Sequence, residues 1–463
     1  MPSKLPMGDV VVLLPGILGS VLERDGHDVW AISPGAVWRA LLSLGHSVND
    51  LELHDDDPSV DDLGDGVTAR CLQPDLHLVP GFWSIDGYSH IRSSIFATFD
   101  VVDGQNWFDF PYDWRRDNRV AARHLAERAP GWLQAWRKRS GNNDAKLVLV
   151  AHSMGGLVAR HYLEVLGGWR DARTLITFGT PYRGSLNALD FLCNGFKKGI
   201  GPLGLDLTRL LRSLTSVYQL LPRYPVVDSG SGPLTRVAET SNLPGVDPTR
   251  ASAALTFHHD IDAAIETRPP NSYAIHPIVG IMQPTSQSAR LEAGSVKMLP
   301  SYEGLDSGGD GTVPRVSATP VELADQGREI YAPDQHGSLQ NSIGSLTQLI
   351  GVLSARPTSN LRGGVSGFGL QIDEIFEIDE PIAATVTSDD PTPTVAATVV
   401  EVATGRPVLE SDLEVDGDGS YRALWPPLRS GDYRLTISAP DSDRDRLPVH
   451  TLFIVAGQDE APL

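Results

Sequence analysis

The sequence predicts an α/β protein with a parallel sheet, followed by a smaller all-β domain. Residues 10–14 form a continuous apolar run, which is typical of a strand buried on both faces of a parallel sheet. A second apolar run, residues 147–151, breaks at a serine-containing turn and resumes with a helix-compatible pattern, so we expect a strand, a turn and a helix there. After residue 367 the periodicity changes to short strands separated by turn signals.

Composition narrows the class of protein. The chain has 463 residues, 41% of them hydrophobic, which is enough to bury at least one large core, and the length suggests about three domains. With 38 basic and 58 acidic residues the formal charge is -20, which argues against a nucleic-acid partner and against bulk electrostatic adsorption to anionic membrane. The two cysteines, Cys71 and Cys193, predict neither a disulfide framework nor a cysteine-rich metal site.

The N-terminus faintly resembles a secretory signal, because Lys4 precedes two apolar runs, residues 10–14 and 17–22. Asp9 interrupts the expected basic region, glycine and proline punctuate the apolar part, and no cleavage pattern follows. We therefore expect residues 10–14 to be a core strand. No apolar stretch reaches the length of a membrane span, so we expect by default a cytoplasmic protein with at most peripheral membrane contact.

The turn Ala151-His152-Ser153-Met154-Gly155 has the form Ala-x-Ser-x-Gly. A strained corner between strand and helix lifts a serine above the sheet edge and requires small neighbours, which Ala151 and Gly155 supply. Ser153 is the predicted nucleophile. The alternative interpretation is a surface turn that happens to contain serine.

A glycine-containing loop, Pro15-Gly16-Ile17-Leu18-Gly19-Ser20, follows the first core strand. Glycine lets a backbone N–H approach a substrate oxygen closely, so we expect the N–H groups of Ile17 and Met154 to form an oxyanion hole. Gly16 and Leu18 are expected to line the substrate pocket. By itself, Pro-Gly-x-x-Gly is only a weak turn signal.

A serine nucleophile needs an acid and a histidine further along the chain. Asp310 lies in a glycine-rich turn at residues 308–314, and His336 follows a strand-like run at residues 329–332, so these two are the predicted partners of Ser153. Asp306 and Asp334 are rival acids. His276 is a poor rival histidine, because it lies inside a strand-like run and precedes any credible acid loop.

Several motifs together resemble the lecithin:cholesterol acyltransferase family, which includes lysosomal phospholipase A2 and phospholipid:diacylglycerol acyltransferase. In order along residues 8–355 they are Leu14-Pro15-Gly16-Ile17-Leu18-Gly19-Ser20, Val79-Pro80-Gly81-Phe82, Phe110-Pro111-Tyr112-Asp113-Trp114-Arg115, the Ala-His-Ser-Met-Gly turn, and Phe178-Gly179-Thr180-Pro181-Tyr182-Arg183-Gly184-Ser185. The resemblance implies an α/β-hydrolase fold acting on lipid esters, and the segments around Asp310 and His336 match the family's acid and histidine motifs. The paired cysteines that the family uses around its lid are missing here.

An insertion over the site is expected at residues 186–270. Leucines recur at helical spacing, including Leu207, Leu210 and Leu214, with Arg209 nearby and Lys197-Lys198 upstream. This pattern suits a lid that covers the acyl pocket, beside Tyr182, and makes transient contact with a membrane surface. An ordinary cap helix with a buried stripe is the alternative. His258-His259-Asp260 lacks a third ligand at suitable spacing, so we expect no metal and no cofactor.

The sequence thus predicts a catalytic domain at residues 1–355, a linker at 356–367 and a small immunoglobulin-like β-sandwich at 368–463. The Asp416-Gly417-Asp418-Gly419 segment is interpreted as a hairpin turn rather than a calcium loop. No chemistry-bearing cluster lies in the last domain, so we expect it to dock to a protein partner or to the catalytic domain.

The predicted function is that of a serine esterase on glycerolipids, most simply a phospholipase A. One alternative is a phospholipid-dependent acyltransferase to an alcohol acceptor. An alternative of another class is a catalytically inert scaffold that acts through the C-terminal β-sandwich.

Overall fold

The structure is a computed structural model. It describes residues 4–31, 51–74, 77–79, 83–85, 87–198, 205–230, 232–292, 294–324, 327, 329–354, 368–388, 394–416, 419–439 and 448–456. The predicted linker at 356–367 lies outside these residues, as do residues 80–82 of the second motif and residues 417–418 of the predicted hairpin turn.

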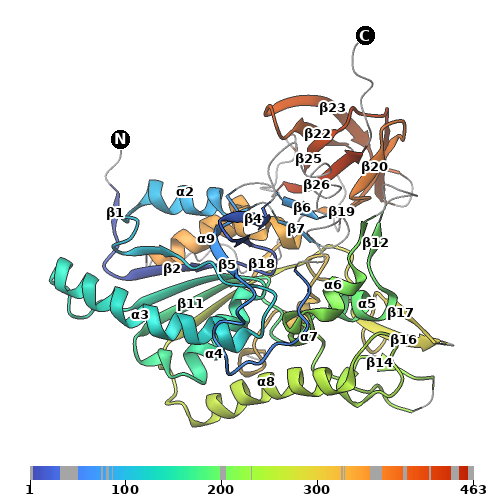
Figure 1. The fold of residues 1–463 in the computed structure, drawn as a ribbon. Helices are drawn as coiled ribbons and strands as arrows, with labels where there is room; N and C mark the ends of the chain where they lie inside the picture. The colour runs from blue at the N-terminus through green and yellow to red at the C-terminus, as the bar shows by residue number, and fades with distance from the viewer. Residues whose placement is uncertain are drawn as a thin grey trace.

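A six-stranded sheet forms the centre of the larger part of the molecule (Figure 1). Its strands lie in the order β18-β15-β11-β10-β2-β9, and every neighbouring pair is parallel. The predicted α/β class with a parallel central sheet is therefore confirmed. The strands are β2 (Val10–Leu14), β9 (Trp107–Asp109), β10 (Leu147–His152), β11 (Ala172–Phe178), β15 (Ala274–Gly280) and β18 (Ile330–Ala332).

Both faces of this sheet are covered by helices. α3 (Asn118–Ser140) and α4 (Gly155–Glu164) lie on one face, and α2 (Ser89–Thr98) and α9 (Ile343–Leu353) lie on the other (Figure 1). Because both faces are covered, all five residues of β2 and all six of β10 are buried. α3 is one helix that contains Pro130, not two helices meeting there.

The strand order predicts a ligand-binding position at the carboxyl ends of β2 and β10. The chain leaves β2 to form β9 on one side, then crosses back to form β10 on the other side of β2. Loops that leave two adjacent parallel strands in opposite directions open a crevice, and open α/β sheets bind ligands there. The Gly16–Leu18 loop and Ser153 therefore lie at the same edge of the sheet.

The predicted insertion at 186–270 contains four helices among its described residues. They are α5 (Leu186–Asn194), α6 (Thr208–Ser213), α7 (Thr215–Gln219) and α8 (Pro248–Thr267). The leucine stripe is not on one continuous helix, because Leu214 has an extended backbone between α6 and α7. Leu207, Leu210 and Leu214 are only 2%, 2% and 0% exposed, so the stripe is part of the core.

Short strands surround the main sheet. A three-stranded antiparallel sheet follows the first core strand and orders as β4-β3-β5. β14, within the insertion, pairs in parallel with β16, and β16 pairs with β17 as a hairpin. These strands are β3 (Ser20–Arg24), β4 (His27–Trp30), β5 (Val67–Leu72), β14 (Val227–Asp228), β16 (Ser288–Glu292) and β17 (Ser295–Leu299).

The described strands after residue 367 form two sheets with a core of their own, at the upper right of Figure 1. One sheet has the order β19-β21-β24 and the other β20-β26-β25-β22-β23. Alternate residues such as Val395, Ala397 and Val399 point into the shared core. The strands are β19 (Phe368–Ile372), β20 (Ile375–Glu377), β21 (Ile382–Ser388), β22 (Thr394–Glu401), β23 (Arg406–Glu414), β24 (Ser420–Trp425), β25 (Gly431–Ser438) and β26 (Val449–Ala456).

Two details of this region differ from the sequence-based prediction. The apolar segment at residues 370–376, which the pattern predicts to be one strand, is two strands, β19 and β20, which belong to different sheets. β23 was not predicted, because this mostly exposed edge strand is rich in charged residues and shows no apolar alternation.

Among the described residues, no helix combines the length and the apolar character needed to cross a membrane.

Candidate active site

Ser153 occupies a strained corner between β10 and α4. Its φ of +52° lies in the left-handed region, which is unfavourable for a residue with a side chain. Its N–H donates to the carbonyl of Phe178 (2.8 Å), and its carbonyl accepts from the hydroxyl of Thr180 (2.9 Å). These two bonds to the end of β11 hold the corner in place.

Two glycines after Ser153 are required by close packing. A Cβ at Gly155 would lie 2.4 Å from the carbonyl oxygen of Pro15, and one at Gly156 would lie 2.0 Å from Oγ1 of Thr180. Neither contact is tolerable, so the corner needs the Gly-Gly pair. The sequence-based argument had identified Gly155 but not Gly156.

His336 lies between the serine and the predicted acid. Its Nε2 is 2.9 Å from Oγ of Ser153, and its Nδ1 is 2.7 Å from Oδ2 of Asp310. Oδ1 of Asp310 accepts from the N–H groups of Thr312 (2.9 Å) and Val313 (2.6 Å). Because a carboxylate only accepts, Nδ1 carries the hydrogen and Nε2 is free to take the serine proton.

The rival residues serve elsewhere. Asp310, not Asp306 or Asp334, meets the imidazole of His336. Oδ1 of Asp306 instead accepts from the N–H of Gly308 (2.8 Å) and from the amide of Gln287, so it stabilises a turn. His276 lies within β15, paired with Ile176 of β11.

Glycines at the ends of two core strands leave room for the acid and the histidine. A Cβ at Gly179, after β11, would lie 2.7 Å from Oδ2 of Asp310 and 2.9 Å from Nδ1 of His336. A Cβ at Gly280, the last residue of β15, would lie 2.2 Å from Cβ of Asp310. Residues at positions 179 and 280 larger than glycine would therefore separate the two catalytic candidates.

The loop after β2 lies directly against the serine. A Cβ at Gly16 would be 2.9 Å from Cβ of Ser153. Among the described residues, neither the N–H of Ile17 nor that of Met154 donates a hydrogen bond to the protein, and Met154 is the N-cap of α4. Free N–H groups at a helix N-terminus suit a developing negative charge. This arrangement fits the predicted oxyanion hole.

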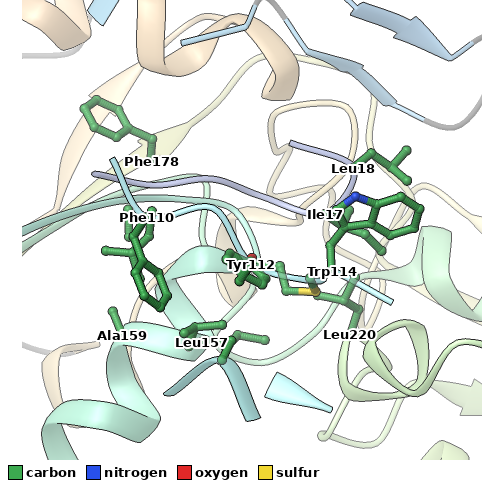
Figure 2. Packing of buried hydrophobic residues seen from close by; sticks show 14 of the residues in the cluster. Ile17, Leu18, Phe110, Tyr112, Trp114, Leu157, Ala159, Phe178 and Leu220 are labelled. Carbon is green, nitrogen blue, oxygen red and sulfur yellow. The ribbon is translucent and has the colours of Figure 1, made fainter. Parts of the chain in front are cut away.

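The Tyr-Asp-Trp-Arg motif donates two side-chain hydrogen bonds to this loop and to the residue that follows it. The hydroxyl of Tyr112 donates to the carbonyl of Pro15 (2.8 Å), and the indole of Trp114 donates to the carbonyl of Ser20 (3.1 Å). Figure 2 shows Trp114 packed beside Ile17 and Leu18. Leu18 itself has a φ of +63°, so the loop is held in a conformation that leucine alone disfavours.

Arg115 of the motif and the next residue, Arg116, hold the acidic loop at residues 52–65. Arg115, fully buried, pairs with Asp65 (2.8 Å) and with Asp113. Arg116 pairs with Asp56 (3.0 Å) and donates to the carbonyls of residues 57, 60 and 61. The motif thus connects the acidic loop to the sheet edge that carries Ser153.

A second chain of hydrogen bonds, which the sequence did not reveal, joins the loop after β2 to the loop that carries His336. The N–H of Gly16 donates to the hydroxyl of Tyr88 (2.8 Å), which lies 3.0 Å from Nδ1 of His152. Nε2 of His152 donates to the carbonyl of His336 (3.1 Å), since a carbonyl can only accept. Nδ1 of His152 therefore accepts from Tyr88. Burial lowers the pKa of His152 to about 3 and raises the pKa of Tyr88, so both remain neutral.

Of the predicted pocket and lid residues, Gly16 lies against Ser153, whereas Tyr182 and the leucines of the predicted lid make structural contacts. The hydroxyl of Tyr182 pairs with that of Thr177 (2.9 Å). The junction between α6 and α7 is tied down by the guanidinium of Arg250, which donates to the carbonyls of Arg212 and Ser213. With the leucine stripe buried, these anchors favour the fixed cap over a mobile lid.

The His258-His259-Asp260 segment has structural partners. Nε2 of His258 donates to the carbonyl of Gln219 (2.9 Å), and Asp260 pairs with Arg119 (2.8 Å). Within the described ranges, no three His, Cys, Asp or Glu side chains are grouped so as to hold a metal ion.

One segment of the chain matches the sequence model of a known family. The sequence model described as Lecithin:cholesterol acyltransferase matches residues 91–246. The resemblance expected from the motifs is therefore confirmed. The matched segment contains the Tyr-Asp-Trp-Arg motif, Ser153 and the Gly-Thr-Pro-Tyr-Arg-Gly-Ser loop, and it ends before Asp310 and His336.

A curated relative points to the same family. Lecithin-cholesterol acyltransferase-like 1 of Arabidopsis thaliana is 24% identical over 222 residues, which are 44% of this chain and 51% of the relative. The chain thus spans about half the length of the curated relative that it matches.

Solved structures show weak overall similarity. Lipase BlEst2 of Bacillus licheniformis in its propeptide form has 12% identity and a TM-score of 0.33, with 98% of this chain and 94% of that chain covered. Phospholipase PlaB from Legionella pneumophila has 10% identity and a TM-score of 0.25, with 96% and 89% covered. The fold described above rests on this chain's own strand order.

Proposed function

We propose that this protein is a serine esterase that cleaves acyl esters of glycerolipids, most simply as a phospholipase A. The observation that carries the proposal is the continuous contact from Ser153 through His336 to Asp310, at 2.9 Å and 2.7 Å. The family resemblance supplies the substrate class, because a lipid ester is the shared substrate of the enzymes that the motifs resemble.

The geometry supports an acyl-enzyme mechanism. Nε2 of His336 removes the proton of Ser153 as Oγ attacks the ester carbonyl, and Asp310 stabilises the resulting imidazolium. The negative oxygen is held by the N–H groups of Ile17 and Met154. His336 then protonates the leaving alcohol, and water, or an acceptor alcohol in the transferase alternative, removes the acyl group from Ser153.

We further propose the finer fold assignments. Residues 1–355 form an α/β-hydrolase domain with a cap at 186–270, and residues 368–463 form an immunoglobulin-like β-sandwich. The parallel sheet with Ser153 at its carboxyl edge supports the first assignment. Two sheets around one apolar core support the second.

The test is mass spectrometry of vesicles of mixed phospholipids incubated with the protein, with and without a long-chain alcohol. The expected products are free fatty acid and lysophospholipid, whereas acyl ester of the added alcohol would favour acyl transfer. Ser153→Ala should lose at least about three orders of magnitude in rate. Activity of Ser153→Ala within tenfold of the wild type would refute the proposal.

The inert-scaffold alternative makes the opposite prediction. A scaffold has no need for an activated serine, so a fluorophosphonate probe would leave it unlabelled. We expect rapid labelling of the wild type, and none of Ser153→Ala.

A further inference from the structure

Strand β19 of the C-terminal region lies against the two loops that carry Asp310 and His336. Gln283, which is 2% exposed, makes the principal connection. Its Nε2 donates to the carbonyls of Pro333 (2.8 Å) and Phe368 (2.9 Å), and its Oε1 accepts from the N–H of Leu370 (3.1 Å). Both amide hydrogens and the oxygen of one side chain thus join β19 to the chain just before His336.

Gln283 also contacts the acid loop through its backbone. Its N–H donates to the carbonyl of Gly309 (3.0 Å), the residue before Asp310. The N–H of His336 donates to the carbonyl of Asp310 (2.8 Å). One buried residue therefore connects the acid loop, the histidine loop and the C-terminal sheet.

Gln335, the neighbour of His336, makes a second connection. Its Nε2 donates to the carbonyl of Leu370 on β19 (3.2 Å), and its Oε1 accepts from the hydroxyl of Thr451 on β26. Rotation of the backbone at position 335 would redirect the imidazole that follows it. These bonds to two C-terminal strands restrict that rotation.

The close approach of β19 depends on a glycine. A Cβ at Gly369 would lie 2.7 Å from the carbonyl oxygen of Met282 and 2.5 Å from Oγ1 of Thr387. Gly369 does not have a positive φ, so the requirement is for space and not for a special backbone conformation. Any side chain at position 369 would push β19 away from Gln283.

The boundary between the two parts is only partly filled by packed side chains. Leu452 and Ile454 of β26 join the apolar core of the larger part, on one side. Beside Asp310 and His336, however, a cavity of about 210 Å³ is lined mostly by polar residues, including Gln283, Gln335 and Thr451. Where packing is absent, the position of a loop depends on its hydrogen bonds.

We propose that the C-terminal region contributes to the active site, in which β19 and β26 act through Gln283 and Gln335 to position Asp310 and His336. The inference rests on the proposed serine-esterase function. Gln283, Gln335 and Gly369 are positioning residues, because none of them contacts Ser153 or the reacting atoms.

The test compares Gly369→Ala and Gln283→Ala with the wild type on a water-soluble p-nitrophenyl ester. Active sites are counted by fluorophosphonate titration, so that a loss of folded protein does not alter kcat per site. We expect kcat per site to fall about tenfold to a hundredfold, as for a small misplacement of a catalytic group, with KM within about twofold. The pH dependence of kcat/KM should shift, because the Asp310–His336 contact changes.

Two further variants complete the design. Gly431→Ala is the matched control in the same C-terminal region, since the nearest atoms to a Cβ there belong to the side chain of Tyr433, at an ordinary contact distance of 3.5 Å, and it should behave like the wild type. Gln335→Ala, at a half-buried position, covers the case in which Gln283→Ala does not fold. It should show the same loss of kcat per site.

Failure of the inference and failure of the proposed function give different results. An unchanged kcat per site and an unchanged pH profile in Gly369→Ala and Gln335→Ala would overturn the inference while leaving the esterase intact. If the wild type itself neither reacts with the probe nor cleaves the ester, the proposed function fails, and the inference fails with it.

Discussion

His336 is held by contacts from distant parts of the chain. Its ring lies between Ser153 and Asp310, and its carbonyl accepts from His152. Gly179 leaves the space that its Nδ1 occupies. A histidine side chain on a loop has several rotamers available. These contacts select the rotamer in which the ring lies between Ser153 and Asp310.

The identity of the acid can be tested by amide substitution. Asp310→Asn keeps the shape of the side chain but disturbs the hydrogen on Nδ1 of His336, so we expect kcat to fall by up to about four orders of magnitude. Asp306→Asn is the matched control, because Asp306 stabilises a turn nearby without touching the imidazole. A larger loss in Asp306→Asn than in Asp310→Asn, measured by steady-state ester hydrolysis, would contradict the assignment.

The bond chain through Tyr88 predicts a second residue-scale effect. Tyr88→Phe leaves the N–H of Gly16 and Nδ1 of His152 without their partner, at about 1–3 kcal/mol per buried unsatisfied group. We expect a lower melting temperature and a kcat reduced about tenfold, because the loop after β2, which carries the proposed oxyanion donor Ile17, loosens. Tyr162→Phe is the control. This buried tyrosine lies near the C-terminal end of α4, away from Ser153, and packs against Gly168. Similar kcat values for the two variants would exclude a role of Tyr88 in the site.

At the scale of elements, the leucines of the cap are buried in the main apolar core. α6 and α7 are each shorter than two turns, and such helices are not stable by propensity alone, so they depend on the burial of their leucines. The N–H of Ser185 also donates to the carbonyl of Leu220 (2.8 Å), which joins the end of α7 to the start of α5. These contacts explain why the predicted single amphipathic helix is two pieces.

A leucine truncation distinguishes a fixed cap from a lid that opens at lipid surfaces. Leu214→Ala should lower the free energy of unfolding by about 2–5 kcal/mol, the usual range for a buried leucine. For a fixed cap, hydrolysis of vesicle lipid and of a soluble ester should change equally per active site. Leu424→Ala, at a leucine that is 73% exposed, is the matched control for stability. A selective loss on vesicles would support the lid.

At the scale of the whole molecule, three buried histidines on three elements make the fold sensitive to acid. Burial lowers the pKa of His152 and His258 to about 3 and that of His161 to about 4. Arg119 and Arg223 near His258 act in the same direction. Because the unfolded chain binds these protons near pH 6.5 and the folded chain does not, this contribution to stability is complete above that pH and is lost as the pH falls from 6.5 towards 3.

His258 offers a test away from the proposed active site. Between pH 7 and pH 5 its exclusion of a proton should remove about 2 kcal/mol of folding free energy. His258→Gln can keep a donor to the carbonyl of Gln219 but does not titrate. Urea denaturation at both pH values should show a smaller decline for His258→Gln by about that amount. Identical declines would show that His258 is not responsible.

Local sequence patterns were enough to predict several elements of this protein. The apolar runs at β2 and β10, the small residues around Ser153 and the leucine-rich cap are visible in the sequence, because strand burial and tight turns impose rules on neighbouring residues. The turns that carry Ser153, Asp310 and His336 were likewise visible in the sequence, and the structure brings these three side chains together. The exposed edge strand β23 was not, since its environment imposes no apolar alternation.

Only the tertiary structure decided which of these residues meet. The choice of Asp310 over Asp306, the chain from Gly16 through Tyr88 to His152, and the connection of Gln283 to β19 all join residues far apart in sequence. A buried glutamine or a strand glycine has no local signature of its role. Its partner is set by which loops the sheet order brings to one edge, and that depends on packing over the whole chain.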